Sequence, residues 1–217
     1  MTTIYFIRHG EATGNRSRLF QGLTDNPLTE RGIAQAEAAA RRFVDVDYDV
    51  IYTSPLVRAQ ETARLINTKQ KPIFVEPDLV EVSMGQMEGL PVDSLDEAYA
   101  PVMELWNRYP HLYVGPGAAD GGSEGASKRL RKVISKIVEQ HPDETVLISA
   151  HGFLLRIFNN WVLGNQFEQL QEVAWGGNTC VTCAKFDQNL NPTPIFINDH
   201  SHLPPELATK DIWKDAR

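Results

Sequence analysis

Residues 3–10 read Thr-Ile-Tyr-Phe-Ile-Arg-His-Gly, and residues 145–152 read Thr-Val-Leu-Ile-Ser-Ala-His-Gly. Each stretch is a short run of β-branched and apolar residues that ends in a histidine and a glycine, which predicts a buried strand followed by a polar turn. The second stretch leads into an apolar helix, expected over 153–163. Ligands of open α/β sheets bind beyond the carboxyl ends of the strands, so His9 and His151 are expected at one sheet edge.

The segments between and after these two strands alternate in the same way. Thr29 is typical of a helix N-cap, and Ser54-Pro55 is expected to cap and begin a helix that runs to Ile66. The other predicted elements are strands at 50–53, 73–75, 179–186 and 194–197, and helices at 93–107 and around 130–138. Strands that alternate with helices predict an α/β fold, a three-layer α/β/α sandwich with a mostly parallel central sheet and helices on both faces.

The pattern shows no linker or internal repeat, so we expect residues 1–217 to form a single domain. Residues 93–122 are expected to form a lid or insert over the ligand pocket. The segment from Tyr109 to Gly122 is rich in glycine and proline and is predicted to be a loop. The polar end of the chain, about 200–217, predicts a loose tail.

Composition narrows the classes of partner. The 217 residues are 42% hydrophobic and 23% charged, and the formal net charge is −7. A negative chain disfavours a nucleic-acid partner, because phosphate backbones attract clustered lysine and arginine. No apolar run approaches the roughly 18 residues of a membrane span, so no membrane partner is expected. Two cysteines imply no disulfide framework, and we expect a cytoplasmic location.

The sequence contains one cysteine pattern and one histidine pattern that resemble metal sites, and both are better explained without a metal. Cys180 and Cys183 form a lone CxxC motif within a predicted strand, and no second motif completes a zinc site. His200 and His202 lie in the predicted tail, where a mobile polar segment is the simpler interpretation. The sequence therefore predicts no metal and no cofactor.

Four arginine or histidine side chains are expected beside the carboxyl ends of the strands. Neutral imidazole at His9 can attack phosphorus, and the neighbouring Arg8 offers donors suited to phosphate oxygens. Arg58 is expected in the first turn of a helix, where a cation is favoured when it shares a bound anion. His151 adds a second imidazole at the start of a helix. Taken singly, each residue could instead be structural: His9 in a strand cap, or Arg58 in an ion pair with Glu61 or Glu30.

Taken together, four motifs in their order resemble the histidine phosphatase superfamily, and most closely its phosphoglycerate-mutase-like branch. The similarity runs from the first residues to about residue 165. The motifs are Arg8-His9-Gly10 with Phe20-Gln21-Gly22, Ser54-Pro55…Arg58-Ala59…Glu61-Thr62, the loop Leu79–Gly89 and Ala150-His151-Gly152.

The resemblance implies a role for each matched residue. His9 is the expected nucleophile, phosphorylated in a covalent intermediate, and Glu81 is the expected acid that protonates the leaving oxygen and then activates water. Arg8, Arg58 and His151 are expected around the phosphoryl oxygens. The further substrate-binding residues are expected to be Asn15, Gln21, Gly22 and Gly152.

Departures from the family pattern bear on the reaction. Many relatives carry tryptophan where this chain has Gly14, and their Gly-Gly-Glu-Ser appears here as Gly121-Gly122-Ser123-Glu124. No counterpart of the extra basic segments of true mutases follows Glu81, which favours hydrolysis over transfer. We expect a metal-independent, histidine acid-type phosphatase, a phosphoric monoester hydrolase, acting on a small phosphorylated metabolite.

Two other functions stay open at this point. One is a phosphoglycerate-type mutase, and the other is a regulatory module that binds a phosphometabolite without turnover. The identity of the phosphomonoester is not encoded in a recognisable motif, and a homodimer is one open arrangement.

Overall fold

The computed structural model describes residues 1–209, and its centre is a six-stranded sheet in the order β3-β2-β4-β1-β5-β6. β1 pairs in parallel with β4, and β2 pairs in parallel with both β4 and β3. β5 runs antiparallel to β1 and to β6. The mixed, mostly parallel sheet that the sequence predicts is thus confirmed. The strands are β1 (Thr2–Arg8), β2 (Val50–Thr53), β3 (Ile73–Val75), β4 (Thr145–Ala150), β5 (Val181–Phe186) and β6 (Pro192–Asp199).

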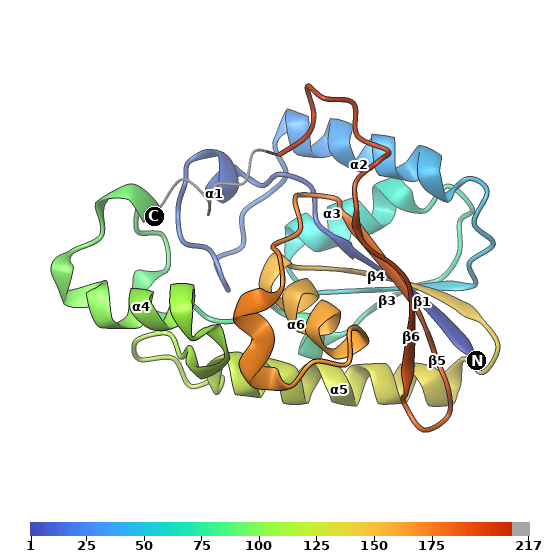
Figure 1. Ribbon diagram of the computed structural model, residues 1–217. Coiled ribbons are helices and arrows are strands. Elements are labelled where there is room, and N and C mark those ends of the chain that lie inside the picture. Colours follow the sequence, from blue (N-terminus) through green and yellow to red (C-terminus); the bar gives the residue numbers. More distant parts are fainter. Residues whose placement is uncertain (210–217) are drawn as a thin grey trace.

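Helices cover both faces of this sheet, as expected for an α/β/α sandwich (Figure 1). α2 and α3 pack on one face, and α5 and α6 pack on the other. The helices are α1 (Thr13–Arg16), α2 (Glu30–Phe43), α3 (Val57–Ile66), α4 (Ala100–Arg108), α5 (Gly122–Gln140) and α6 (Gly152–Val162). No helix among the described residues is both long and apolar enough to cross a bilayer.

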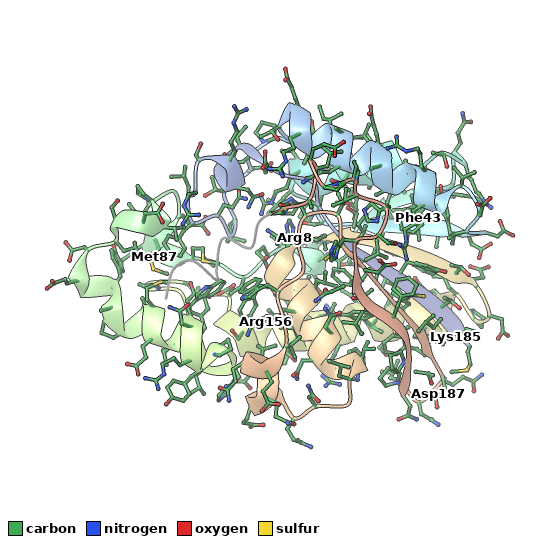
Figure 2. All side chains as sticks on the ribbon, turned by 45° about the horizontal axis from the view of Figure 1, so that its top comes forward. Arg8, Phe43, Met87, Arg156, Lys185 and Asp187 are labelled. Atoms are coloured by element: carbon green, nitrogen blue, oxygen red, sulfur yellow. The ribbon has the colours of Figure 1, made fainter. Side chains whose placement is uncertain are left out.

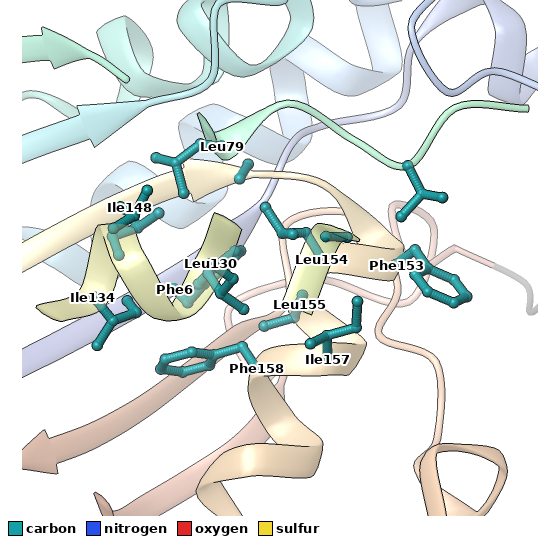
Figure 3. Close-up of a cluster of buried hydrophobic side chains, with 14 of the residues drawn as sticks. Phe6, Leu79, Leu130, Ile134, Ile148, Phe153, Leu154, Leu155, Ile157 and Phe158 are labelled. Atoms are coloured by element: carbon teal, nitrogen blue, oxygen red, sulfur yellow. The ribbon is translucent and has the colours of Figure 1, made fainter. Parts of the chain in front are cut away.

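The two covered faces explain why the central strands carry apolar residues on both sides. Along β1, Ile4 and Phe6 join the cluster formed with α5 and α6, while Ile7 joins the cluster formed with α2 and α3. Successive side chains of a strand point to opposite faces, so a sheet that is covered on both sides buries apolar side chains on both of them. Figure 3 shows Phe6 and Ile148 among side chains of the α5–α6 layer.

Two predicted helix starts differ from the structure. Ser54-Pro55 is not helical, and α3 begins at Val57 with Leu56, in an extended conformation, as its N-cap. The helix predicted over 93–107 begins instead at Ala100. Short 3₁₀ turns at Val92–Ser94 and Glu97–Tyr99 precede it, and Pro101 occupies its first turn, where proline is favoured.

The predicted loose tail is wrong for residues 200–209, which are tied to the body of the molecule. Gln35 donates to the carbonyl oxygen of Leu207 at 2.8 Å, and Arg31 donates to that of Ala208 at 2.7 Å. The hydroxyl of Thr209 hydrogen-bonds to the Asn178 side chain at 3.1 Å. Polar composition predicts exposure but not hydrogen bonding of the backbone, which explains the error. Residues 210–217 lie outside the described residues.

Candidate active site

A cavity opens beyond the carboxyl ends of the parallel strands and brings together side chains from distant parts of the sequence. It encloses about 530 Å³, including open solvent at its mouth. Arg8 and His9 reach it from the end of β1, Arg58 from the start of α3, and Gly152 from the start of α6. Figure 2 shows Arg8 near the middle of the molecule. The residues that line the cavity are Arg8, His9, Asn15, Leu19, Phe20, Gln21, Arg58, Glu81, Met84, Val92, Trp106, Gly152 and Trp175.

His9 is held with one ring nitrogen bonded to the backbone and the other facing a cation. Its Nδ1 lies 2.6 Å from the carbonyl oxygen of Gly10, and its Nε2 lies 3.2 Å from Nε of Arg58. A carbonyl accepts and a guanidinium donates, so Nδ1 carries the proton and Nε2 presents a lone pair. Burial, Arg58 and Arg8 hold the pKa of His9 well below its usual value. His9 is therefore a neutral imidazole with a nucleophilic Nε2.

Two buried arginines supply positive charge beside His9. The guanidinium of Arg58 donates to the carbonyl oxygens of Thr24 at 2.7 Å and Gly22 at 2.8 Å, besides its contact with His9. Burial lowers the pKa of Arg58 to about 10, so it stays charged at neutral pH. Arg8 donates to the carbonyl oxygen of Gly176 at 2.5 Å. A guanidinium has more donors than the three bonds of Arg58 use, which leaves N–H groups for an anion.

His151 lies against His9, with ring centroids 5.3 Å apart, and is oriented by Ser54. Nε2 of His151 lies 2.7 Å from the Ser54 hydroxyl, which also accepts from the backbone N–H of Leu56 at 3.3 Å. Nδ1 of His151 is buried without a hydrogen-bond partner among the described residues. If the hydroxyl donates to Nε2, the proton of the neutral ring sits on Nδ1, which becomes a donor for a ligand. Burial, Arg58 and His9 lower the pKa of His151.

Glu81 is a buried carboxyl group next to the start of α6. Its oxygens accept from the backbone N–H groups of Phe153 at 2.9 Å, Leu154 at 3.2 Å and Val82 at 3.0 Å. Burial raises the pKa of Glu81, and the hydrogen bonds from Phe153 and Val82 together with Arg58 and Arg8 oppose that rise. A carboxyl group with a raised pKa beside two arginines is suited to give and take a proton.

The chain that carries these two facing imidazoles, two arginines and a buried carboxyl group also matches the model of a known protein family. The family model described as "Histidine phosphatase superfamily (branch 1)" matches residues 4–196. The chain belongs to this superfamily. The resemblance seen in the sequence motifs is thereby confirmed, and the match extends into β6, beyond the 165 residues over which the motifs run.

Individual relatives of this histidine phosphatase carry different names. The chain is 34% identical over 202 residues to "Uncharacterized phosphatase PhoE" of Bacillus subtilis, covering 92% of this chain and 97% of that protein. It is 31% identical over 176 residues to "Probable phosphoglycerate mutase GpmB" of Yersinia pestis, covering 76% of each. A crystal structure of phosphoserine phosphatase from Entamoeba histolytica with 3-phosphoglyceric acid is similar with a TM-score of 0.77 at 27% identity, covering 94% and 100%.

The four predicted substrate-binding residues are placed differently from one another in this histidine phosphatase. Asn15 and Gln21 line the cavity, and Nε2 of Gln21 is buried without a hydrogen-bond partner among residues 1–209. Gly152 also lines it, and a Cβ atom there would lie 3.1 Å from the guanidinium of Arg8. The N–H of Gly22, by contrast, is bonded to Glu88 at 3.0 Å, so Gly22 acts on Arg58 through its carbonyl.

Several residues of the site were missed by sequence reasoning. The position of Ser54 before a proline predicts only a helix cap, and the loop motif Leu79–Gly89, which contains Glu88, implies no role for that residue. Asn178 donates to the carbonyl oxygen of His9 at 3.0 Å, and Trp175 lines the cavity. Nothing in the local pattern around residues 175–178 signals a site, because these contacts depend on a segment 169 residues away in the chain.

The transposed pair Ser123 and Glu124 lies at the start of α5. Ser123 is fully buried, and its hydroxyl has no hydrogen-bond partner within the described chain. Glu124 is exposed and pairs with Lys128 at 2.6 Å. Neither lines the cavity, so the transposition leaves the acidic side chain outside the site.

The described residues contain no group of three or more histidine, cysteine, aspartate or glutamate side chains arranged to hold a metal. His202 instead lies 3.2 Å from the hydroxyl of Thr179, and Cys180 and Cys183 are both buried free thiols.

Proposed function

We propose that this histidine phosphatase is a metal-independent phosphoric monoester hydrolase of the histidine acid type that works through a phosphohistidine on His9. The observation that supports this most strongly is the neutral Nε2 of His9 between a buried cation and a second histidine. Phosphoryl transfer needs positioning and charge stabilisation more than covalent help from the protein, and the cavity offers both.

In the first step, the lone pair of His9 Nε2 attacks phosphorus and the bond from phosphorus to the ester oxygen breaks. The leaving oxygen takes that electron pair and a proton from Glu81. The phosphoryl oxygens are stabilised by N–H groups of Arg8 and Arg58 and by Nδ1–H of His151. Donors that are already fixed in a buried site stabilise developing charge without reorganising.

In the second step, water attacks phosphorus, the phosphorus–nitrogen bond breaks and His9 regains its lone pair. The carboxylate of Glu81 accepts a proton from the attacking water, which returns it to the acid form. Inorganic phosphate leaves, and the free enzyme is regenerated. One carboxyl group therefore acts as acid and then as base.

The walls of the cavity favour an apolar leaving group. Beyond the phosphate-facing groups, the lining side chains are apolar or aromatic: Leu19, Phe20, Met84, Val92, Trp106 and Trp175. Among the described lining residues, Arg8 and Arg58 supply the positive charge, and both face His9. A substrate carboxylate would lose its hydration there without a matching cation. This supports hydrolysis of aryl or apolar esters over exchange on phosphoglycerate.

The test is phosphate release from a panel of esters by the wild type and by His9→Ala, with EDTA present throughout. The panel pairs p-nitrophenyl phosphate and naphthyl phosphate with 3-phosphoglycerate and phosphoserine. We expect release by the wild type alone, faster from the aryl esters. His9→Ala should keep the fold, because the residue lies at a polar sheet edge.

Each contrary outcome identifies a different function. Comparable hydrolysis by His9→Ala would remove the phosphohistidine mechanism. Exchange of phosphate between positions of phosphoglycerate, without release, would establish the mutase. Tight binding of an ester with no turnover would establish the binding module. A homodimer and a cytoplasmic location stay predictions.

A further inference from the structure

The carboxylate of Glu88 collects five hydrogen bonds from two loops. Its Oε1 accepts from the backbone N–H groups of Leu23 at 2.8 Å and Met84 at 2.9 Å. Its Oε2 accepts from the N–H groups of Gly22 at 3.0 Å and Thr24 at 3.2 Å, and from the Thr24 hydroxyl at 2.6 Å. Every lone-pair direction of the carboxylate is thus used within the protein.

The three consecutive residues 22–24, here called the 22–24 loop, are the ones that hold Arg58. Glu88 accepts from the N–H groups of this loop. The carbonyl oxygens of Gly22 and Thr24, in the same loop, accept from the two terminal nitrogens of Arg58. The Nε–H group of Arg58 is directed at Nε2 of His9, and one N–H group on each terminal nitrogen is left for an anion. The direction of the guanidinium is therefore set by the position of the loop.

Glu88 also fixes that loop relative to the segment that carries the acid. Met84, which donates to Glu88, follows Glu81 by three residues. The 22–24 loop packs closely on this segment, since a Cβ atom at Gly22 would lie 2.2 Å from the carbonyl oxygen of Val82. The carboxylate of Glu88 thus connects the 22–24 loop, which holds Arg58, to the segment that carries Glu81.

We infer that Glu88 is a positioning residue for phosphoryl transfer, which aligns Arg58 on the phosphoryl group through the 22–24 loop. The inference rests on the proposed function, because it concerns the same transition state. The carboxylate form persists at working pH: burial would raise the pKa of Glu88, but the hydrogen bonds from Thr24, Leu23, Met84 and Gly22 lower it.

The first test is Glu88→Gln, which keeps the shape but replaces one acceptor oxygen with an NH₂ donor. In either orientation, the amide nitrogen faces at least two N–H groups, so the loop must shift. We expect kcat/KM for p-nitrophenyl phosphate to fall roughly 100-fold, the scale of a misplaced catalytic group. The inhibition constant of inorganic phosphate should rise as well, because Arg58 contacts the bound anion.

The matched control is Asp49→Asn. Asp49 also accepts a backbone N–H, that of Thr145 at 2.9 Å, but it precedes β2 at the opposite end of the sheet. We expect this variant to keep wild-type kcat/KM and wild-type phosphate inhibition.

A double-mutant cycle with Arg58→Lys separates positioning from general loosening. Lysine keeps the charge but cannot bridge the two loop carbonyls. If Glu88 acts through Arg58, the double variant should be about as slow as the slower single variant. Losses that multiply would show that Glu88 acts elsewhere and would overturn the inference.

A second variant covers the case in which Glu88→Gln does not fold. Thr24→Val removes the single hydroxyl donor to Glu88 and leaves the carboxylate in place. Several-fold loss of kcat/KM at unchanged melting temperature would support the inference, and full activity would overturn it. Full activity of Glu88→Gln would overturn it too, while His9-dependent hydrolysis, and hence the proposed function, would stand.

Discussion

Nε of Arg58 lies 3.2 Å from Nε2 of His9 and donates its hydrogen to it, and this contact fixes the protonation state of the proposed nucleophile. An N–H donor needs a lone pair to accept it, so the contact selects the neutral ring with its other nitrogen protonated toward Gly10. Burial and the two neighbouring arginines act in the same direction on the pKa of His9. The proposed nucleophile is therefore a neutral imidazole in the substrate-free protein.

Glu81→Gln should separate substrates by their leaving groups. The amide cannot donate a proton to the ester oxygen, so hydrolysis of an alkyl phosphate should slow on the order of 100-fold. p-Nitrophenolate leaves without protonation, so formation of the phosphohistidine from p-nitrophenyl phosphate should slow much less. The measurement is the burst-phase rate for both esters. Equal slowing of the two would argue against Glu81 as the acid.

Ser54→Ala should impair catalysis through His151. Loss of the hydroxyl frees Nε2 of His151 to take the proton, which removes the Nδ1–H donor, and we expect kcat to fall roughly 10-fold. Ser149→Ala is the control, because Ser149 is also fully buried and donates to the carbonyl oxygen of Ala59 at 2.9 Å. Both variants should lose similar stability, and equal kcat values would refute the role of Ser54.

Gly152→Ala should weaken substrate binding without weakening the fold. The added Cβ atom would meet Arg8 at 3.1 Å, so the guanidinium must move by a few tenths of an ångström. We expect KM to rise about 10-fold. Alanine in a helix is favoured over glycine, so the melting temperature should hold or rise. An unchanged KM would show that Arg8 adapts without losing its contact with phosphate.

Acid should destabilise the protein through its buried histidines. The pKa values of His9 and His151 lie well below the usual 6.5 in the folded state. Below pH 6.5 the unfolded chain therefore binds more protons, and the free energy of unfolding falls as pH falls. Between pH 6.5 and about pH 5, each histidine costs at most about 2 kcal/mol.

Urea unfolding of the wild type and of His9→Gln at these two pH values measures the effect of His9. Glu81 contributes with the opposite sign, since its raised pKa makes the folded state bind a proton above 4.5, and the comparison cancels it. The variant should lose less stability on acidification than the wild type. An equal loss in both proteins would mean that His9 is protonated in the folded state.

The architecture could be predicted from the sequence because the apolar composition of the strands indicates that they are buried. An apolar run such as 145–149 predicts a strand that is covered on both faces. The helical periodicity of the segments between such runs predicts the helices that cover them. The same runs end in His9 and His151, so their placement at one edge of the sheet follows from parallel topology. The motifs around Arg58 and Glu81 completed the predicted site.

The partners of these residues were decided by the tertiary structure. Ser54 meets His151 across 97 positions of the chain, and Glu88 meets Gly22 across 66. Such pairs leave no trace in local periodicity or in capping preference, which are the signals a single sequence carries. The hydrogen bonds that tie residues 200–209 to the body of the molecule are likewise not visible in the local sequence.

The sequence by itself therefore predicted the sheet, and it placed His9, His151 and the arginines around them at one edge of it, since strand ends and motifs are local features. The tertiary structure alone decided how the ring nitrogens of each histidine are hydrogen-bonded, which carbonyl oxygens orient Arg58 and which side chains line the cavity. Those choices depend on hydrogen-bond geometry, which exists only once distant segments have packed together.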